Sequence, residues 1–219
     1  MRRGLLPFIV LLAASCSDDN SPTQPSGPAL SFFVTSVTSR TGNLGGLAGA
    51  DVTCQVLAAA AGHGGRTWRA YLSVESDPTN ANRPTHARDR IGSGPWFNAA
   101  GLLVASSVAD LHSRTGDPNV FVDESGRRIN GQWTGSPPPV EHDILTGSNA
   151  DGTLAPGLTC ADWTSGSPAV AAQVGHSDGM GPNQSTAGSL SSWNSAHANL
   201  NCADTGPRGG AGRFYCFAP

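Results

Sequence analysis

The sequence contains no lysine, and its thirteen basic side chains are all arginine. Acidic residues number sixteen, so the formal net charge is −3 at pH 7. A chain that is acidic overall lacks the concentrated positive charge with which proteins attract nucleic acids and anionic lipids. The absence of lysine also excludes the Gly-Lys-Ser/Thr phosphate loop of nucleotide-binding proteins. We therefore expect neither a nucleic-acid partner nor a nucleotide.

Two metal-binding motifs are also missing. The chain has no Cys-x-x-Cys pair, the spacing typical of zinc ribbons and thioredoxin-type redox sites. It also has no Asp-x-Asp-x-Asp-Gly run of the kind that forms an EF-hand. Loops rich in oxygen atoms at 116–119, 147–153 and 193–201 would suit calcium, but turn formation explains their composition without an ion. We predict no cofactor, and calcium is not indicated.

The N-terminus carries a short apolar run, "GLLPFIVLLAA", preceded by Arg2 and Arg3 and followed by small residues. This pattern is typical of a secretory signal, and the run is too short for a permanent membrane-spanning helix. The ending Leu-Ala-Ala-Ser-Cys resembles the lipobox of bacterial lipoproteins. The resemblance implies cleavage before Cys16, lipid attachment to Cys16 and a place in the bacterial cell envelope, at the outer membrane or cell surface. The alternative is an ordinary signal in which Cys16 is incidental.

These features divide the chain into a signal peptide at 1–15, a lipidated cysteine with a polar Pro/Ser-rich tether at 16–30, and one domain at 31–219. Twenty-eight glycines and sixteen prolines separate short apolar runs, which predicts a loop-rich domain with more strand than helix. We expect strands at 31–37, 67–74, 119–122 and 213–217, and helices at about 49–61 and 98–112.

Local patterns assign faces to two of these elements. In 67–74 the alternation places Trp68, Ala70, Leu72 and Val74 on one side and Tyr71 on the other. Helical spacing over 49–61 predicts a buried face, with Asp51 in the first turn. The residues expected on that face are Ala50, Cys54, Val56, Leu57 and Ala61.

Four cysteines remain after Cys16: Cys54, Cys160, Cys202 and Cys216. In an oxidising compartment they would form two disulfides, and their spacing leaves three pairings open.

Several segments carry a family resemblance: "GGLAGADVTCQ", "WRAYLS", "GSNADGTLAPGLTCADW", Cys202 and the final "RFYCF". In this order they resemble the endostatin-like domain that ends some vertebrate collagens, and bacterial lipoprotein domains of unassigned function, over about 41–219. The resemblance implies an α+β, C-type-lectin-like fold: a twisted antiparallel sheet, two helices, long loops and two nested disulfides. It also implies the pairings Cys54–Cys216 and Cys160–Cys202.

The chain departs from these families at their known binding sites. Endostatin binds zinc through histidines near its N-terminus, and "SPTQPSGPALSFF" contains none. Endostatin binds heparin through arginine clusters, whereas this chain is acidic. Sugar-binding C-type lectins use a Trp-Asn-Asp run for calcium, but Ser195 follows Trp193 and Asn194 here. The resemblance therefore predicts a binding domain without naming its ligand.

Histidines beside carboxylates mark the remaining candidate site, in "EHD" at 141–143 and "HSD" at 176–178. We predict a non-catalytic, surface-anchored domain that binds an extracellular glycan, matrix polymer or protein, with no catalytic residue and no metal site. The alternatives are a secreted hydrolase using His142 and Asp143 or His176 and Asp178, with or without zinc, and a purely structural envelope protein. The candidate ligand-binding residues are His142, Asp143, Asn149, Asp151, His176, Asp178, Asn194 and His197.

Overall fold

The computed structural model describes Met1 and residues 28–219. The predicted signal peptide, the lipid-attachment residue Cys16 and most of the predicted tether lie outside the described residues. Within the described part of the chain, no helix is both long enough and apolar enough to cross a membrane.

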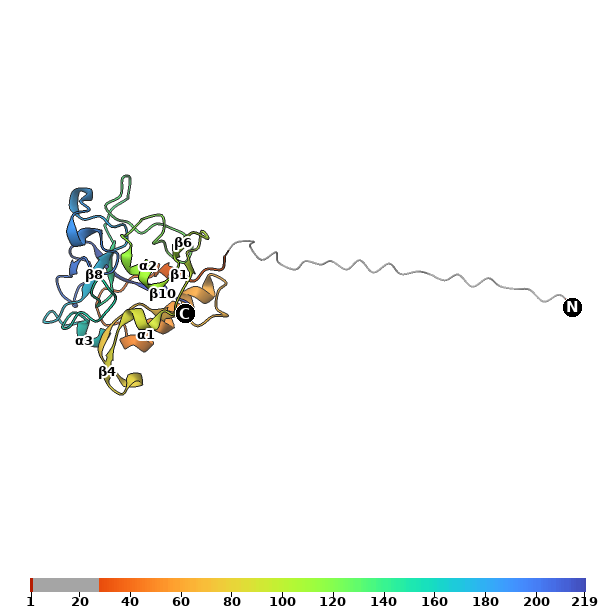
Figure 1. The fold of residues 1–219 in the computed structure, drawn as a ribbon, viewed down its shortest axis with the longest axis horizontal. Coiled ribbons are helices and arrows are strands. Elements are labelled where there is room, and N and C mark those ends of the chain that lie inside the picture. Colours follow the sequence, from red (N-terminus) through yellow and green to blue (C-terminus); the bar gives the residue numbers. More distant parts are fainter. Residues whose placement is uncertain (2–27) are drawn as a thin grey trace.

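A mixed six-stranded sheet forms the centre of this α+β fold (Figure 1). Its strand order is β1-β10-β7-β8-β9, with β2 also paired to β10. The expected antiparallel sheet is wrong at one place, because β7 and β10 run parallel. The long segment between these two strands contains β8 and β9 and supplies the crossover that a parallel pair requires. The strands are β1 (Phe32–Val34), β2 (Arg69–Ala70), β7 (Asp143–Leu145), β8 (Gln173–His176), β9 (His197–Ala198) and β10 (Gly210–Phe217).

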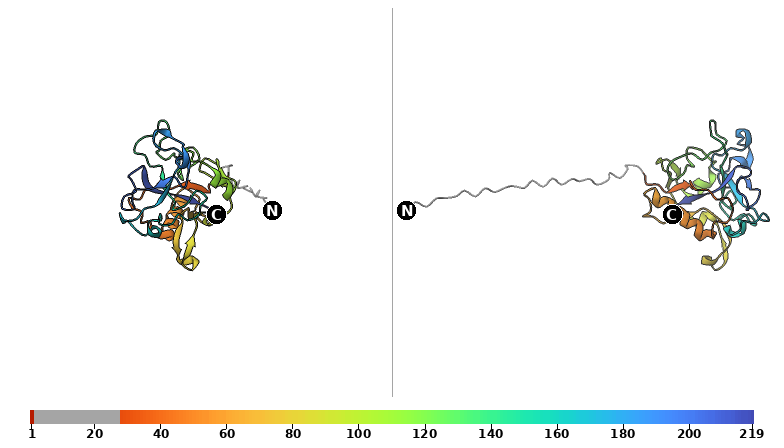
Figure 2. Two further views of the ribbon diagram at one scale, coloured as in Figure 1. Left: turned by 60° about the vertical axis from the view of Figure 1, so that its left-hand side comes forward. Right: turned by 180° about the vertical axis from the view of Figure 1, so that it is seen from behind.

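The described residues also form three α-helices, where the resemblance implied two, and two small hairpins. One hairpin pairs β3 (Val74–Asp77) with β4 (Arg83–Thr85) and projects from the body of the domain in each view (yellow in Figures 1 and 2). The other pairs β5 (Trp96–Phe97) with β6 (Leu103–Ala105). The helices are α1 (Gly46–Ala60), α2 (Val108–Ser113) and α3 (Cys160–Trp163).

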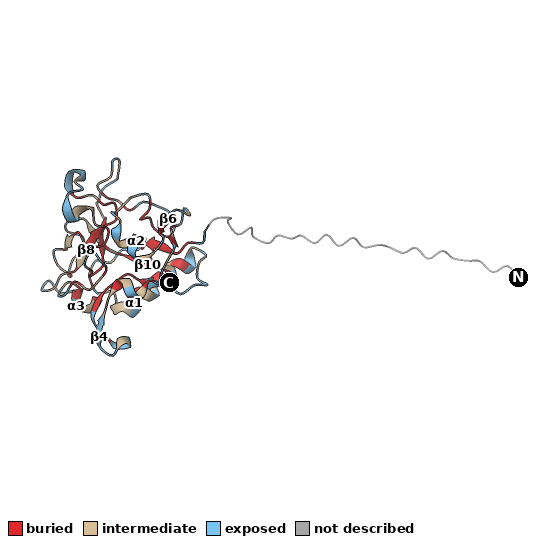
Figure 3. Cartoon of the chain, in the orientation of Figure 1, coloured by how far each residue is buried: buried red, intermediate tan, exposed pale blue. Residues whose placement is uncertain are grey.

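Apolar cores lie on both faces of the sheet, because successive strand side chains point to opposite sides. Phe33 packs with α1 and α3, whereas Phe32 packs with α2 and the β5–β6 hairpin. The predicted alternation in 67–74 is confirmed: Trp68 and Ala70 join the first core and Tyr71 the second. Figure 3 shows the buried residues along the sheet, with exposed residues in the surrounding loops, on β4 and on part of α1.

Helix α1 buries a narrower face than its sequence predicts. Ala50 and Cys54 are buried as expected, but Val56 is 61% exposed. At 100° per residue Val56 lies about 200° around the helix from Cys54, so both cannot face the sheet. Asp51 is not in the first turn, since the helix begins at Gly46. Its carboxylate instead forms ion pairs that tie α1 to β2 and a neighbouring 3₁₀ turn, through Arg69 and Arg90.

The predicted helix at 98–112 is wrong over its first half. Gly101 adopts a positive φ of 74°, which turns the chain between β5 and β6. Helix α2 begins only after Ser107, whose side chain accepts the backbone N–H of Asp110 as an N-cap. The predicted strand at 119–122 is also wrong, because that segment contributes only an isolated bridge at Val122.

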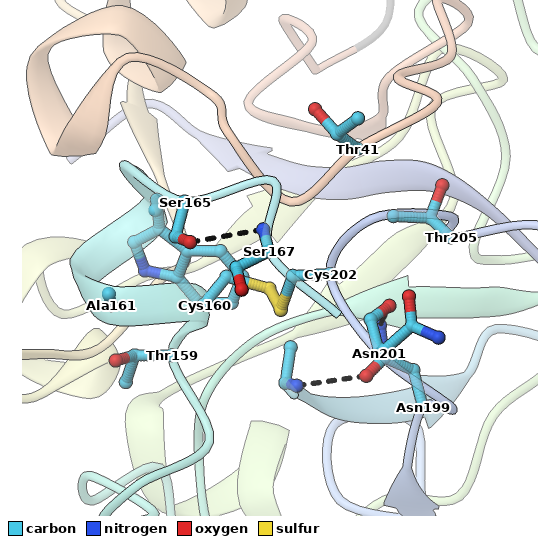
Figure 4. Close-up of a disulfide and its surroundings, with 12 residues drawn as sticks. Thr41, Thr159, Cys160, Ala161, Ser165, Ser167, Asn199, Asn201, Cys202 and Thr205 are labelled. Atoms are coloured by element: carbon cyan, nitrogen blue, oxygen red, sulfur yellow. Dashed lines mark hydrogen bonds between the residues drawn. A yellow bond between two sulfur atoms is a disulfide. The ribbon is translucent and has the colours of Figure 1, made fainter. Parts of the chain in front are cut away.

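The two disulfide pairings implied by the resemblance are confirmed. Cys54–Cys216 joins α1 to β10 across 162 positions of sequence. Cys160–Cys202, shown in Figure 4, joins α3 to the segment after β9 across 42 positions. The second disulfide therefore closes the part of the chain that carries β8 and β9.

Candidate functional site: a buried histidine–aspartate cluster

Strand register brings three distant side chains to the same face of the sheet. Asp143 on β7 lies opposite His176 on β8, and His197 on β9 lies opposite Val174. Since residues two apart on a strand share a face, Val174 and His176 point the same way, and His197 becomes a diagonal neighbour of His176. His142 immediately precedes β7, and its ring stacks on that of His176 with centroids 4.4 Å apart.

We call His142, Asp143, His176 and His197 the His/Asp cluster. His142 Nε2 and His176 Nε2 lie 3.4 Å and 3.3 Å from Asp143 Oδ1. His197 Nε2 lies 3.6 Å from Asp143 Oδ2 and 3.0 Å from His176 Nε2. All three imidazoles therefore direct the same ring nitrogen towards one carboxylate.

The other ring nitrogen of each histidine is already engaged. His142 Nδ1 donates to Asp178 Oδ1 at 2.7 Å. His176 Nδ1 and His197 Nδ1 donate to backbone carbonyls, those of Leu190 at 2.8 Å and Ala198 at 2.9 Å. Carboxylate and carbonyl oxygens can only accept hydrogen bonds, so Nδ1 carries the proton in each neutral ring. In a neutral ring Nε2 therefore carries a lone pair directed towards Asp143, and the 3.0 Å contact between Nε2 of His176 and Nε2 of His197 requires a proton on one of them or an ion between them.

Asp178 positions His142 and also binds the backbone of the two loops that contain Gln132 and Met180. Besides His142, its carboxylate accepts the backbone N–H groups of Gln132 at 2.6 Å and Met180 at 3.1 Å. Burial alone would raise the pKa of Asp178, but these hydrogen bonds, led by that of His142, hold it below its usual value. Gly131 is required beside this group, because a Cβ there would overlap Asp178 Oδ2.

The cluster is buried, and its carboxylate contacts the three imidazoles without a normal hydrogen bond. The side chains of His142, Asp143 and His176 are only 1–3% exposed. Neither carboxylate oxygen of Asp143 has a hydrogen-bond partner among the described residues. Burial alone would lower the pKa of His176, but its interactions with the Asp143 carboxylate, its hydrogen bond to the Leu190 carbonyl and the charge of Asp178 together raise it. The charge of this buried carboxylate must be balanced by a cation, either a protonated imidazole or a metal ion bound between the histidines.

Both the donor set and the spacing suit a metal ion. Donor atoms of His142, Asp143 and His176 all lie within 4.8 Å of one another. Zinc–nitrogen bonds of about 2.0–2.1 Å at tetrahedral angles would place two donors about 3.3 Å apart. The distances from Asp143 Oδ1 to Nε2 of His142 and His176, 3.4 and 3.3 Å, match this value, while His197 Nε2 lies 3.6 Å from the other oxygen, Oδ2, and 3.0 Å from His176 Nε2. The rings of His142 and His176 are nearly parallel, at 7°, so one must tilt to aim its lone pair at a shared ion.

Five of the eight predicted ligand-binding residues come together here: the four cluster residues and Asp178. The other three lie in turns outside the cluster. Asn149 and Asp151 form hydrogen bonds with Thr153, and Asn194 donates to the hydroxyl of Tyr71. Sequence reasoning missed the outer hydrogen bonds to Leu190 and Ala198, which no pattern reveals because backbone carbonyls accept them.

Residues 175–179, Gly-His-Ser-Asp-Gly, fit the G-x-S-x-G pattern of a nucleophile elbow, but the structure does not form one. An elbow requires an α-helix directly after the serine. After β8 the described chain instead forms a turn and a 3₁₀ helix at Pro182–Gln184.

Comparison with known proteins finds no family model and no curated protein that matches this chain. The site is therefore interpreted from its own geometry.

Proposed function

We propose that this domain binds a divalent transition-metal ion, zinc by preference, through the His/Asp cluster. The observation that carries the proposal is the buried carboxylate of Asp143, which has no hydrogen-bond partner among the described residues and faces three imidazole lone pairs. A cation of charge two satisfies the carboxylate and the lone pairs together. Hydrogen bonds at each Nδ1 match the outer partners that orient metal-ligating histidines in proteins.

The donor chemistry favours zinc over calcium. Imidazole nitrogen suits zinc, copper and nickel, whereas calcium takes six to eight oxygen ligands. The cluster offers three nitrogens and one carboxylate. Four protein donors also match a closed structural zinc site, because catalytic zinc keeps a position open for water. This supports the non-catalytic reading over the hydrolase alternative.

A place in the cell envelope completes the proposal. Two disulfides support an oxidising compartment outside the cytoplasm. We propose lipid anchoring through Cys16, as the lipobox resemblance implies, with the metal-binding domain displayed at the outer membrane or cell surface. Replacing Cys16 by serine should then release the protein from the membrane fraction, and unchanged retention would contradict the anchor.

The finer assignment of the fold is also a proposal. The α+β architecture and both confirmed disulfide pairings support the endostatin-like, C-type-lectin-like fold. The zinc site proposed here differs from that of endostatin, because its donors come from the middle and end of the domain. A glycan, matrix polymer or protein partner remains an expectation from the sequence.

Metal uptake tests the function directly. The purified chain, stripped with chelator and dialysed against zinc, should retain one zinc per molecule in elemental analysis. When free zinc is held just above the dissociation constant of the unaltered chain, Asp143→Asn and His176→Ala should carry almost no zinc, while His63→Ala, a histidine outside the cluster, should keep it. Equal zinc content in all four proteins, or no zinc in the unaltered chain, would refute the proposal.

A further inference from the structure

His197 differs from the other donors of the His/Asp cluster in its access to solvent. Its side chain is 30% exposed, against 1% for Asp143 and His176 and 3% for His142. It belongs to β9, a strand of two residues at the end of the strand order. Of the four donors, His197 is therefore the one that reaches solvent.

We infer that His197 is the exchangeable fourth ligand, and that the metal ion enters and leaves where this side chain turns aside. This inference rests on the proposed metal-binding function. His142, Asp143 and His176 would hold the ion throughout, because their side chains are buried and their donor atoms lie within 4.8 Å of one another.

The hydrogen bonds of His197 allow it to move alone. Its Nδ1–H bonds to the carbonyl of the next residue, Ala198, and the other contacts that the structure records for its side chain are with the cluster itself, through Asp143 and the ring of His176. His176, in contrast, is held by Leu190, fourteen residues away, and His142 by the buried Asp178. Groups with few buried contacts open at low free-energy cost, whereas groups fixed from several directions do not.

The backbone that carries His197 is held in place on both sides. Ala196 donates its N–H to Val174 O before β9. After β9, Asn199 Oδ1 accepts the N–H of Ala172, close to the Cys160–Cys202 disulfide (Figure 4). Opening thus requires a rotation of the side chain rather than the loss of the strand.

Displacement of His197 would open one coordination position to small nitrogen donors. The test uses the full-length chain in detergent, loaded with cobalt(II), whose intense visible absorption reports four-coordinate geometry. The variants are His197→Ala, His176→Ala and the control His63→Ala. Transfer of the metal to a chromogenic chelator gives the release rate.

His197→Ala should bind cobalt, release it at least roughly tenfold faster than the unaltered chain, and lose part of the four-coordinate spectrum. Added imidazole should restore that spectrum, because the missing side chain leaves a space that solvent reaches. Imidazole should not restore His176→Ala, whose position is 1% exposed. His63→Ala should match the unaltered chain.

The possible failures are distinguishable. If the unaltered chain binds no metal, the proposed function itself is wrong. If His197→Ala keeps the original spectrum and release rate while His176→Ala loses its metal, only the role of His197 is overturned. Imidazole rescue of His176→Ala alone would also overturn it. His197→Gln, which preserves more side-chain volume, repeats the test if the alanine variant does not fold.

Discussion

Replacing Asp143 by asparagine should stabilise the metal-free protein but not the zinc-loaded protein. The substitution keeps the shape of the side chain and removes its charge. In the metal-free protein at pH 8, the native carboxylate is 1% exposed and lacks a hydrogen-bond partner among the described residues. The asparagine amide can instead donate to the nitrogens of His142 and His176, which lie 3.4 and 3.3 Å from Oδ1. We expect a gain of about 1–3 kcal/mol in the free energy of unfolding.

In the zinc-loaded protein this gain should be cancelled or reversed. At free zinc a thousandfold above the dissociation constant, binding stabilises the native chain by about 4.1 kcal/mol. Asp143 is the only carboxylate among the four donors, so we expect its loss to weaken binding by about 100-fold, the upper end of the effect of losing a supporting partner. Zinc would then stabilise the variant by only about 1.4 kcal/mol.

Urea unfolding followed by tryptophan fluorescence measures the free energy of unfolding of the metal-free protein, with chelator, and of the zinc-loaded protein. Asp89→Asn, whose side chain is 62% exposed, is the matched control and should change neither. If Asp143→Asn shifted stability by the same amount in both conditions, Asp143 would be a structural side chain and our reasoning about the cluster would be refuted.

Three further predictions concern the surrounding fold. Replacing both cysteines of the Cys160–Cys202 disulfide by serine should lower the free energy of unfolding by about 4 kcal/mol, because the disulfide closes a loop of 42 positions. It should also weaken zinc binding, since that loop carries the donors His176 and His197. Unchanged zinc affinity in a titration would contradict this. Gly175→Ala should destabilise by about 1–3 kcal/mol in urea unfolding, because its Cβ would overlap the carbonyl of Trp193, whereas Gly65→Ala, with open space around it, should not. Burial tends to raise the pKa of Asp77, but hydrogen bonds from threonine side chains and backbone lower it overall. The stability that ionised Asp77 contributes is therefore fully present above its ordinary pKa of 3.8, and it is lost as the pH falls through the lower pKa of the folded state. The difference in free energy of unfolding between the native chain and Asp77→Asn should accordingly shrink between pH 7 and pH 3. A constant difference would contradict this.

Local sequence patterns predicted those parts of the fold that depend on neighbouring residues. Alternation in 67–74 assigned Trp68 and Tyr71 to opposite cores, and helical spacing turned Cys54 inward. The final strand was also recognised, as β10. The disulfide pairing followed from the family resemblance, because spacing alone left three arrangements open. Where a turn intervened, as at Gly101, the pattern extended the helix too far.

The sequence by itself determined the compartment we propose, the loop-rich α+β class and the pairs of histidine and carboxylate at 141–143 and 176–178. Only the tertiary structure decided that these pairs meet. Their contact depends on the register of Asp143 opposite His176 and on the diagonal place of His197, which are set by packing between strands far apart in the chain. A register shift of one residue would turn each of these side chains to the other face of the sheet. Periodicity records which residues share a face within a segment, but not which segments become neighbours, and the candidate metal site lies between segments.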